Sequence, residues 1–220
     1  PEYTAGICRA FVANGLHQQV PFKVLAEGPM FRFERPQKGR QRQFHQIDVE
    51  VLGAAEPAAD VEVIVLAAAI LDALEVLDKC TLELNSLGDG ESRQNYRAAL
   101  VDYFGARRDR RAEDSQRRLA VNPLRILDSK DQGDRELIKD APLIGDYWNA
   151  ASRGVFAAVR RGLEQLGVAH AVEPRLVRGL DYYTHTAFEF TTRELGAQGA
   201  VIAGGRYDGL IAELGGPPTA

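Results

Sequence analysis

Residues 28–53, GPMFRFERPQKGRQRQFHQIDVEVLG, place a group of basic side chains close in sequence to a row of polar and acidic ones. The basic residues lie in PQKGRQR (36–42), where a proline and a glycine prevent a continuous strand. Gln46, Asp48 and Glu50 follow with a period of two, which puts their side chains on one face of a strand. An arginine-rich loop above such a face suits a polyanion whose other end is cationic and polar.

Two alternating stretches, residues 31–35 and 44–52, predict the antiparallel hairpin that would hold this loop. Arg32 and Glu34 share the face of Gln46, which we predict to be the polar floor of a site. A solvated face of an antiparallel sheet is the alternative. The opposite face is expected to pack in the core, and it carries Phe31, Phe33, Ile47, Val49 and Val51.

The whole chain has 220 residues and a formal net charge of −4, so the molecule as a whole is not a cationic surface for nucleic acid. Its longest apolar run, residues 63–71, is far shorter than the roughly 18 residues of a membrane span. Cys8 and Cys80 have no metal-ligand spacing and are expected to be buried thiols in a reducing compartment. We therefore expect a cytoplasmic protein. The chain opens on PEYTAG without Met, which suggests a piece of a longer protein.

Periodicity along the chain predicts an α+β fold in which a helical segment is inserted into a sheet domain. Residues 91–167 have helical periodicity and no convincing strand, and they hold 15 Lys and Arg against 12 Asp and Glu. Positive charge is therefore concentrated in the middle of an acidic chain. The other expected elements are helices at 4–16 and 57–77 and strands at 22–26, 80–86, 170–174, 184–192 and 199–205, with a turn at the glycine pair 204–205.

Three stretches carry a resemblance to a known family. FRFERPQKGRQRQFHQIDVEVLG (31–53) closely resembles motif 2 of class II aminoacyl-tRNA synthetases, in the form carried by histidyl-tRNA synthetases. RLVRGLDYYTHTAFEF (175–190) resembles that family's histidine-binding signature, and AGGRYDGL (203–210) is similar to it as well. The resemblance implies a class II synthetase-type antiparallel β-sheet flanked by helices, with an inserted mainly helical domain. Its implied divisions are a first part of the catalytic core at 1–90, the insertion at 91–167, and a second part of the core at 168–220.

Members of this family join histidine to ATP as an adenylate and then pass the histidyl group to the tRNA 3′ end. The resemblance therefore implies L-histidine, ATP with its Mg²⁺, and tRNA(His) as partners. Because two anions must be brought together, arginines and magnesium supply what the first step needs. Arg32 and Arg178 would contact the α-phosphate, and Arg178 also the histidine carboxylate. Arg40 would reach the terminal phosphates, and Glu34 and Phe44 would read and stack the adenine.

A pocket selective for histidine needs polar partners for both imidazole nitrogens and for the ammonium group. The resemblance implies that Glu50 and Tyr183 contact the imidazole and that Tyr207 completes the pocket wall. Taken singly, tyrosines such as these are more often plain core or turn aromatics. The α-amino group would be held by Glu2, Thr4 and Gln46.

The basic cluster of the inserted segment is the candidate tRNA contact, with a solvated helix face as an equal alternative. It comprises Arg107, Arg108, Arg110 and Arg111. The four histidines are scattered, so no metal site of the protein itself is expected. The full-length family forms homodimers, and its motif 1, its motif 3 arginine and its anticodon-binding domain lie outside this sequence. We therefore expect weak or absent adenylation by this piece alone.

Two other functions compete with the catalytic one. A synthetase-like regulatory subunit of ATP phosphoribosyltransferase would bind histidine without catalysis, and a synthetase-like module could sense tRNA. The first would usually lack the inserted segment and the intact LVRGLDYY, and the second would not need Arg32 or Arg178. Two local points stay open as well. Arg178 could form a structural ion pair with Asp181, and Asp48 stands where the family often has a small residue.

Overall fold

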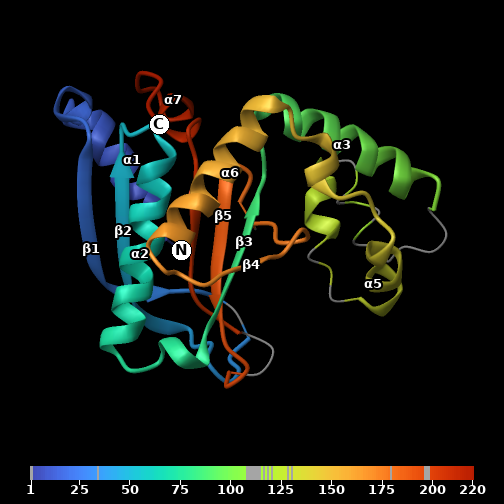
Figure 1. Cartoon of the computed structure of the whole chain (residues 1–220), viewed down its shortest axis with the longest axis horizontal. Helices are drawn as coiled ribbons and strands as arrows, with labels where there is room; N and C mark the ends of the chain where they lie inside the picture. The colour runs from blue at the N-terminus through green and yellow to red at the C-terminus, as the bar shows by residue number, and fades with distance from the viewer. Residues whose placement is uncertain are drawn as a thin grey trace.

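The computed structural model describes residues 2–33, 35–107, 115, 117, 119, 121–127, 129, 131–178, 180–195 and 199–220. It has a mixed α+β architecture, which confirms the predicted fold class (Figure 1). The strands are β1 (Phe22–Phe31), β2 (Gln43–Leu52), β3 (Thr81–Ser86), β4 (Ala171–Val172), β5 (Thr184–Thr191) and β6 (Ala200–Arg206). The helices are α1 (Thr4–Ala13), α2 (Pro57–Ala73), α3 (Gly90–Gly105), α5 (Gln132–Lys139), α6 (Ala150–Gln165) and α7 (Leu210–Glu213). Single 3₁₀ turns lie at Leu16–Gln19, Leu77–Lys79, Pro123–Ile126 and Ile144–Tyr147.

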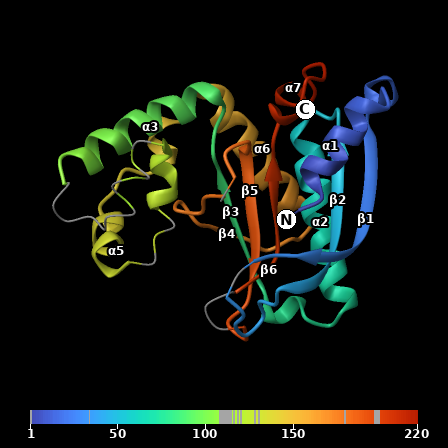
Figure 2. The same ribbon diagram turned by 180° about the vertical axis from the view of Figure 1, so that it is seen from behind.

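The described strands form two separate sheets. β1 and β2 make an antiparallel hairpin, and the second sheet has the order β4-β3-β5-β6. β5 is antiparallel to both β3 and β6, in agreement with the expected antiparallel sheet. The short β4 runs parallel to β3, so the sheet as a whole is mixed. β6 is the strand of the second sheet that lies nearest β2 in both ribbon views (Figures 1 and 2). No backbone ladder joins the two sheets among the described residues.

The hairpin differs from its predicted form, because β1 is a single strand that runs unbroken to Phe31. The expectation of separate strands at 22–26 and 31–35 is therefore wrong. Pro29 lies inside β1, opposite His45, and is tolerated because β1 is an edge strand that pairs only with β2 in the described structure. The register runs from the Phe22–Leu52 pair to the Phe31–Gln43 pair.

The buried face of the hairpin is the polar one, which corrects the expectation that the apolar face packs in the core. Glu50 on the polar face is 6% exposed, whereas Leu25 and Ile47 on the other face are each 60% exposed. The physical reason is the position of α1, which lies on the polar face (Figure 2). Its Phe11 packs with Leu52 of β2 in one hydrophobic cluster. The polar face of the hairpin, predicted to be the floor of a site, is therefore covered by α1.

Both long N-terminal helices are shorter than their predicted spans. α1 ends at Ala13 rather than at 16 because Gly15 adopts a left-handed φ of 65°, which turns the chain out of the helix. α2 ends at Ala73 rather than at 77. The two cysteines are free, as expected, but only Cys8 is buried, whereas Cys80 is partly buried. No helix in the described residues is long and apolar enough to span a membrane.

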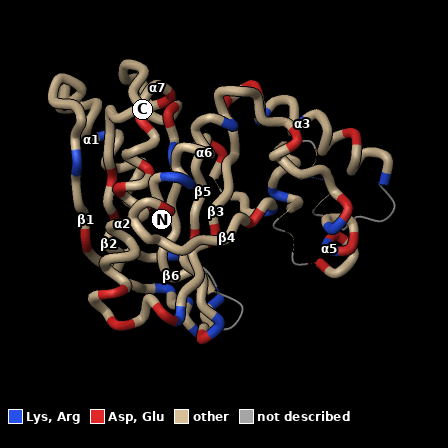
Figure 3. Tube along the Cα trace, viewed as in Figure 1, with Lys and Arg blue, Asp and Glu red and all other residues tan. Residues whose placement is uncertain are grey.

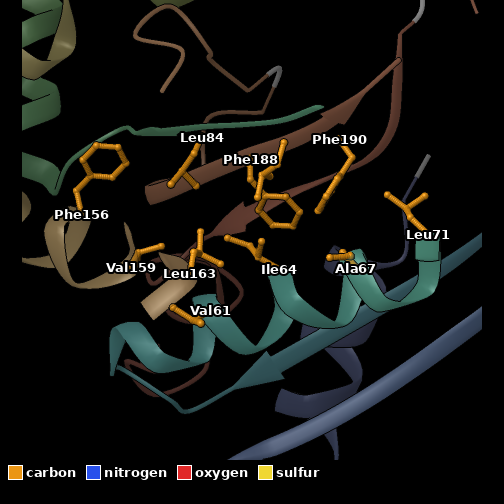
Figure 4. Close-up of a cluster of buried hydrophobic side chains, with 12 residues drawn as sticks. Val61, Ile64, Ala67, Leu71, Leu84, Phe156, Val159, Leu163, Phe188 and Phe190 are labelled. Atoms are coloured by element: carbon orange, nitrogen blue, oxygen red, sulfur yellow. The ribbon is translucent and has the colours of Figure 1, made fainter. Parts of the chain in front are cut away.

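The main hydrophobic core lies between α2, α6 and the second sheet. Figure 4 shows side chains of α2 pointing toward strands β3 and β5, with side chains of α6 beside them. α6 therefore packs on the sheet together with α2. The expected end of the inserted segment at residue 167 stays a prediction. The buried members of this core that Figure 4 labels are Val61, Ile64, Ala67, Leu71, Leu84, Phe156, Val159, Leu163, Phe188 and Phe190.

The glycine pair 204–205 lies inside β6 and does not form the predicted turn. A Cβ on Gly204 would stand 2.8 Å from the Phe188 ring, and one on Gly205 would stand 2.4 Å from the Thr186 carbonyl oxygen and 3.0 Å from the Tyr183 ring. Such distances are below normal contact, so only glycine fits. The pair is explained by aromatic rings that pack directly on the strand.

Two helix N-caps, Asp89 of α3 and Asn149 of α6, lie side by side. Asp89 accepts a hydrogen bond from the backbone N–H of Ser92 at 2.8 Å, and Asn149 accepts one from that of Ser152 at 2.9 Å. The Asn149 amide also donates to Asp89 at 2.7 Å. The backbone N–H of each cap donates to the serine hydroxyl of the other helix, both at 3.1 Å. The N-termini of α3 and α6 therefore cap each other.

We expect Asp89→Ala to lower the free energy of unfolding at pH 7 by about 2 kcal/mol, because it removes one cap and one of the two carboxylate acceptors of the Asn149 amide, the other being Glu91. Burial opposes ionisation of Asp89, but hydrogen bonds from Ser92 and Asn149 lower its pKa from 3.8 to about 2. The contribution of the carboxylate is therefore present above the unfolded pKa and is lost as the pH falls toward 2. Urea unfolding at pH 7 and at pH 3 measures both effects. Asp89→Asn is the matched control, since asparagine caps equally well, and equal losses in the two variants would contradict the capping role.

Candidate active site

A cavity of about 1070 Å³ lies between the two sheets. The polar face of β2 forms one wall, and β6 with the loop before β5 forms the other. α2 and β6 add apolar side chains. Glu34 lies outside the described residues. The lining includes all ten described residues that the sequence assigned to ATP or histidine, which are Glu2, Thr4, Arg32, Arg40, Phe44, Gln46, Glu50, Arg178, Tyr183 and Tyr207.

One end of the cavity gathers carboxyl groups beneath hydroxyl donors. Glu50 accepts hydrogen bonds from the hydroxyls of Tyr207 and Thr4. Glu2 accepts one from the Tyr182 hydroxyl at 2.6 Å. Thr4 and Glu50 are each only 6% exposed. The first turn of α1 and the end of β2 therefore meet at a buried carboxylate.

The electrostatics of this end favour a cation. Burial, together with the smaller effect of the neighbouring Asp48 charge, raises the pKa of Glu50 to about 7, although the hydroxyls of Thr4 and Tyr207 oppose the shift. Burial also raises the pKa of Asp48, and its Oδ2 is buried with no hydrogen-bond partner. A cationic group placed here would favour the ionised form of both carboxyls and would satisfy the free acceptor.

Three tyrosines form the wall above Glu50. The ring centroids of Tyr183 and Tyr207 lie 6.5 Å apart with their planes at 87°, and Tyr182 lies 4.7 Å from Tyr183 and 5.8 Å from Tyr207. Burial raises the pKa of all three hydroxyls, so each is a neutral donor near pH 7. Tyr183 and Tyr207 therefore line the cavity and belong at the same time to the packed interior.

The other end of the cavity is basic. The Arg32 guanidinium lies over the Phe44 ring, with Cζ 4.1 Å from the ring centroid, and its Nε donates to the carbonyl oxygen of Gln41 at 2.9 Å. The loop closes in a tight turn in which Gln37 and Arg40 exchange two backbone hydrogen bonds of 2.9 and 3.0 Å. Arg32 thus covers one face of the Phe44 ring. Lys and Arg positions mark this loop in Figure 3.

Arg178 extends from the loop before β5 to the cavity. Its Nη1 donates to Glu189 of β5 at 2.6 Å, and its Cζ lies 5.3 Å from the centroid of the Tyr183 ring. Its Nε is buried with no hydrogen-bond partner in the structure. The alternative ion pair with Asp181 is not formed, and Asp181 accepts a hydrogen bond from Asn122. Arg178 therefore has a partner that fixes it and a donor that is still free.

The polarity of the cavity changes in order along β2. Phe44, Gln46, Asp48 and Glu50 share one face, and six residues of strand span about 20 Å. Arg32 contacts the first of these side chains, and Tyr207 contacts the last. The site is therefore an elongated groove with arginines at one end and carboxyls at the other.

The predicted tRNA contacts lie mostly outside the described residues, as Arg108, Arg110 and Arg111 do. Arg107 belongs to the C-terminus of α3 and packs on Tyr103 of the same helix, with Cζ 3.9 Å from the ring centroid. Its Nη1 donates to the Tyr103 carbonyl oxygen at 2.9 Å. Arg107 does not line the cavity.

Two contacts at the site were missed by the sequence analysis. Glu189 pairs with Arg178, and its position between Phe188 and Phe190 was a signal, because alternation turns it to the opposite face of β5. Arg206 pairs with Asp60, 146 residues away, and no local pattern indicates that contact. No group of three or more His, Cys, Asp or Glu in the described part of the chain is arranged to hold a metal ion.

The fold is of the class II synthetase type. It is similar to a crystal structure of apo S. aureus histidyl-tRNA synthetase, with a TM-score of 0.78 and 36% identity over 100% of this chain and 52% of that one. A family model described as histidyl-tRNA synthetase matches residues 1–220. The chain therefore belongs to the histidyl-tRNA synthetase family, as its motifs predict.

Curated relatives agree with this placement. The chain is 60% identical over 219 residues to a histidine–tRNA ligase of Rhodospirillum rubrum and 57% identical over 219 residues to one of Gluconacetobacter diazotrophicus. Each match covers 100% of this chain and 53% of the relative, so the chain spans about half the length of these proteins. A Bacillus halodurans structure described as an ATP phosphoribosyltransferase regulatory subunit/histidyl-tRNA synthetase shares the fold at 23% identity and a TM-score of 0.61.

Proposed function

We propose that this chain is the catalytic-core segment of a histidine–tRNA ligase. In the longer protein it would activate L-histidine with ATP to histidyl-adenylate and transfer the histidyl group to tRNA(His). The observation that carries the proposal is the ordered polarity along β2, with arginines at one end of the groove and carboxyls at the other. Histidine and ATP joined end to end have the complementary order, a cationic amino acid followed by a polyphosphate.

The carboxyl end would bind and select the histidine. Glu50, held by Thr4 and Tyr207, would accept a hydrogen bond from the imidazole, and Tyr183 would donate to its other nitrogen. The α-ammonium would lie near Glu2, Thr4 and Gln46. Because these buried polar groups stay unpaired when a wrong side chain enters, the pocket would reject amino acids without an imidazole.

The basic end would bind the nucleotide and bring it to the histidine carboxylate. Arg178 lines the cavity beside Tyr183, so its free Nε–H would donate to the histidine carboxylate, and another N–H of its guanidinium would contact the α-phosphate. Arg32 would contact the same phosphate, and Arg40 the terminal ones. Phe44 would stack on the adenine, and Glu34 would read it. Mg²⁺ bound with ATP would neutralise phosphate charge, and the three arginines would share that task.

The remaining assignments belong to the longer protein. We place it in the cytoplasm as a homodimer, with the inserted helical segment against the acceptor stem of the tRNA. Arg107, Arg108, Arg110 and Arg111 are the proposed contacts there. The proposed division of the chain stays 1–90, 91–167 and 168–220.

The experiment that tests the proposal is calorimetric titration of the 220-residue chain with histidine, with and without ATP and Mg²⁺. We expect histidine to bind at least about 100-fold more tightly than amino acids that lack an imidazole, because the pocket is lined by buried polar groups. Histidinol, which keeps the imidazole and the ammonium but lacks the carboxylate, is the matched control ligand for the Arg178 contact. Equal affinities for histidine and for leucine or glutamine would contradict the assignment.

A further inference from the structure

Arg206, at the end of β6, is the centre of a buried network that the proposed chemistry does not use. It is 8% exposed. Its Nε donates to both carboxylate oxygens of Asp60 at 3.2 Å, and its Nη2 donates to Asp60 at 3.2 Å and to the Glu56 carbonyl oxygen at 3.1 Å. Its Nη1 donates to the Ala54 carbonyl oxygen and to Asp208, both at 3.1 Å. All three nitrogens of the guanidinium are therefore used.

This network connects the two sheets. Arg206 belongs to the four-stranded sheet, whereas Ala54, Glu56 and Asp60 belong to the segment that leads from β2 into α2. Because no backbone ladder joins the sheets among the described residues, their separation near this end of the cavity depends on side-chain contacts. Arg206 donates to four acceptor oxygens of that segment from a single planar group, and a planar guanidinium fixes direction as well as distance.

The next residue along the chain makes the second contact between the sheets. Tyr207 donates its hydroxyl hydrogen to Glu50 of β2 at the carboxyl end of the cavity. Consecutive Cα atoms are about 3.8 Å apart, so a displacement of Arg206 displaces Tyr207 as well. The Tyr207 ring also packs edge-on against Tyr182 and Tyr183. The direction of the Tyr207 hydroxyl is therefore set from both sides, by the tyrosine cluster and by the Arg206 network.

We propose that Arg206, oriented by Asp60, is the positioning residue of the proposed histidine site, which places the Tyr207 hydroxyl against Glu50 and so sets the width of the imidazole pocket. The inference rests on the proposed function for the identity of the ligand. The contact between Tyr207 and Glu50 exists without any ligand, so the positioning role can be tested separately.

The variants must keep the fold, because removal of a buried ion partner leaves the other charge uncompensated. Arg206→Lys keeps the positive charge, but lysine has a single donor nitrogen. It cannot donate hydrogen bonds to Asp60 and to the backbone carbonyls at the same time. Asp60→Asn keeps the shape and removes the charge that orients the guanidinium, while Asp208 stays as a carboxylate partner of Arg206. The matched control is Asp134→Asn, which alters a carboxylate that is 0% exposed and accepts from Ser115 and Ser129, away from the cavity.

The first measurement uses no ligand. The chain is labelled with ¹³C at the tyrosine Cζ, and Tyr207→Phe identifies the Tyr207 signal. We expect Arg206→Lys and Asp60→Asn to shift that signal and Asp134→Asn to leave it in place. A Tyr207 signal that is unchanged in Arg206→Lys would overturn the positioning role, whatever the chain binds.

The second measurement is the affinity for histidine. We expect Arg206→Lys to weaken binding about tenfold in the wild-type background and much less in the Tyr207→Phe background, because the effect passes through Tyr207. Equal losses in the two backgrounds would show a general structural effect and contradict the inference. If the wild-type chain does not select histidine, the proposed function fails, and the Tyr207 signal still decides whether Arg206 positions it.

Discussion

Arg178→Ala is expected to lower the rate of histidine-dependent ATP–pyrophosphate exchange by about 100- to 1000-fold in the full-length protein that contains this chain. The proposed reaction joins two anions, and Arg178 is a cationic side chain that lines the cavity beside Tyr183. Its Nε–H is buried with no hydrogen-bond partner, so the donor is already desolvated before a ligand arrives. A desolvated donor stabilises the charge that develops on the α-phosphate more strongly than a solvated donor does. Its loss therefore raises the activation barrier of the adenylation step.

The controls separate this effect from the loss of the ion pair with Glu189. Arg178→Lys keeps a positive charge beside Glu189 but loses the planar set of donors, so we expect an intermediate loss of rate. Arg175→Ala is the matched control, since Arg175 is three residues away and donates to the carbonyl oxygens of Lys139 and Ala141 rather than lining the cavity. A rate for Arg178→Ala within about twofold of that for Arg175→Ala would remove Arg178 from the mechanism.

Local pattern and the family resemblance were enough to name residues that the structure brings to one cavity, because each of them belongs to a short, regular or distinctive stretch. The period of two in β2 puts Gln46, Asp48 and Glu50 on one face, and the structure keeps them on one face. The family resemblance then associated that face with Arg178 and Tyr207, which lie more than 120 residues further along the chain. The fold class and the family followed from the same stretches.

Contacts between distant segments could not be predicted in this way. Which face of β2 is buried depends on where α1 packs, and the position of α1 is a property of the whole fold. The ion-pair partner that the sequence offered for Arg178, as an alternative, was Asp181, three residues away. The actual partner, Glu189, lies on β5. The glycine pair in β6 has the composition of a turn, and only the rings of Phe188 and Tyr183 explain it.

Glu50→Gln is expected to make the ligand-free chain more stable at pH 8 and at the same time to weaken histidine binding about 10- to 100-fold. Burial raises the pKa of Glu50 from 4.5 to about 7, with the Asp48 charge adding to the shift. The folded state therefore holds a proton more tightly than the unfolded state does. The stability of the wild-type chain falls as the pH rises from about 4.5 to 7, and the full cost is present above 7.

The size of the stability effect follows from that shift. One pKa unit corresponds to about 1.4 kcal/mol, so the buried charge costs up to about 3 kcal/mol at pH 8. Glutamine carries no charge and still accepts hydrogen bonds from Thr4 and Tyr207, so the variant avoids this cost. At pH 5 the wild-type Glu50 is protonated in the folded state, and the two chains should differ little. Urea unfolding of both chains at pH 5 and pH 8 gives the comparison.

The loss of affinity has the opposite sign because the same charge becomes favourable once a cationic or donor ligand is present. A hydrogen bond to a charged group contributes about 1.5–3 kcal/mol, which corresponds to the expected loss on calorimetric titration at pH 8. Glu27→Gln is the matched control, since Glu27 lies on the exposed face of the same hairpin, opposite Ile47, and should change neither quantity. If Glu50 had only a structural role, Glu50→Gln would lower both the stability and the affinity for histidine. Higher stability with lower affinity at pH 8 would instead identify a carboxylate whose role is to bind the ligand.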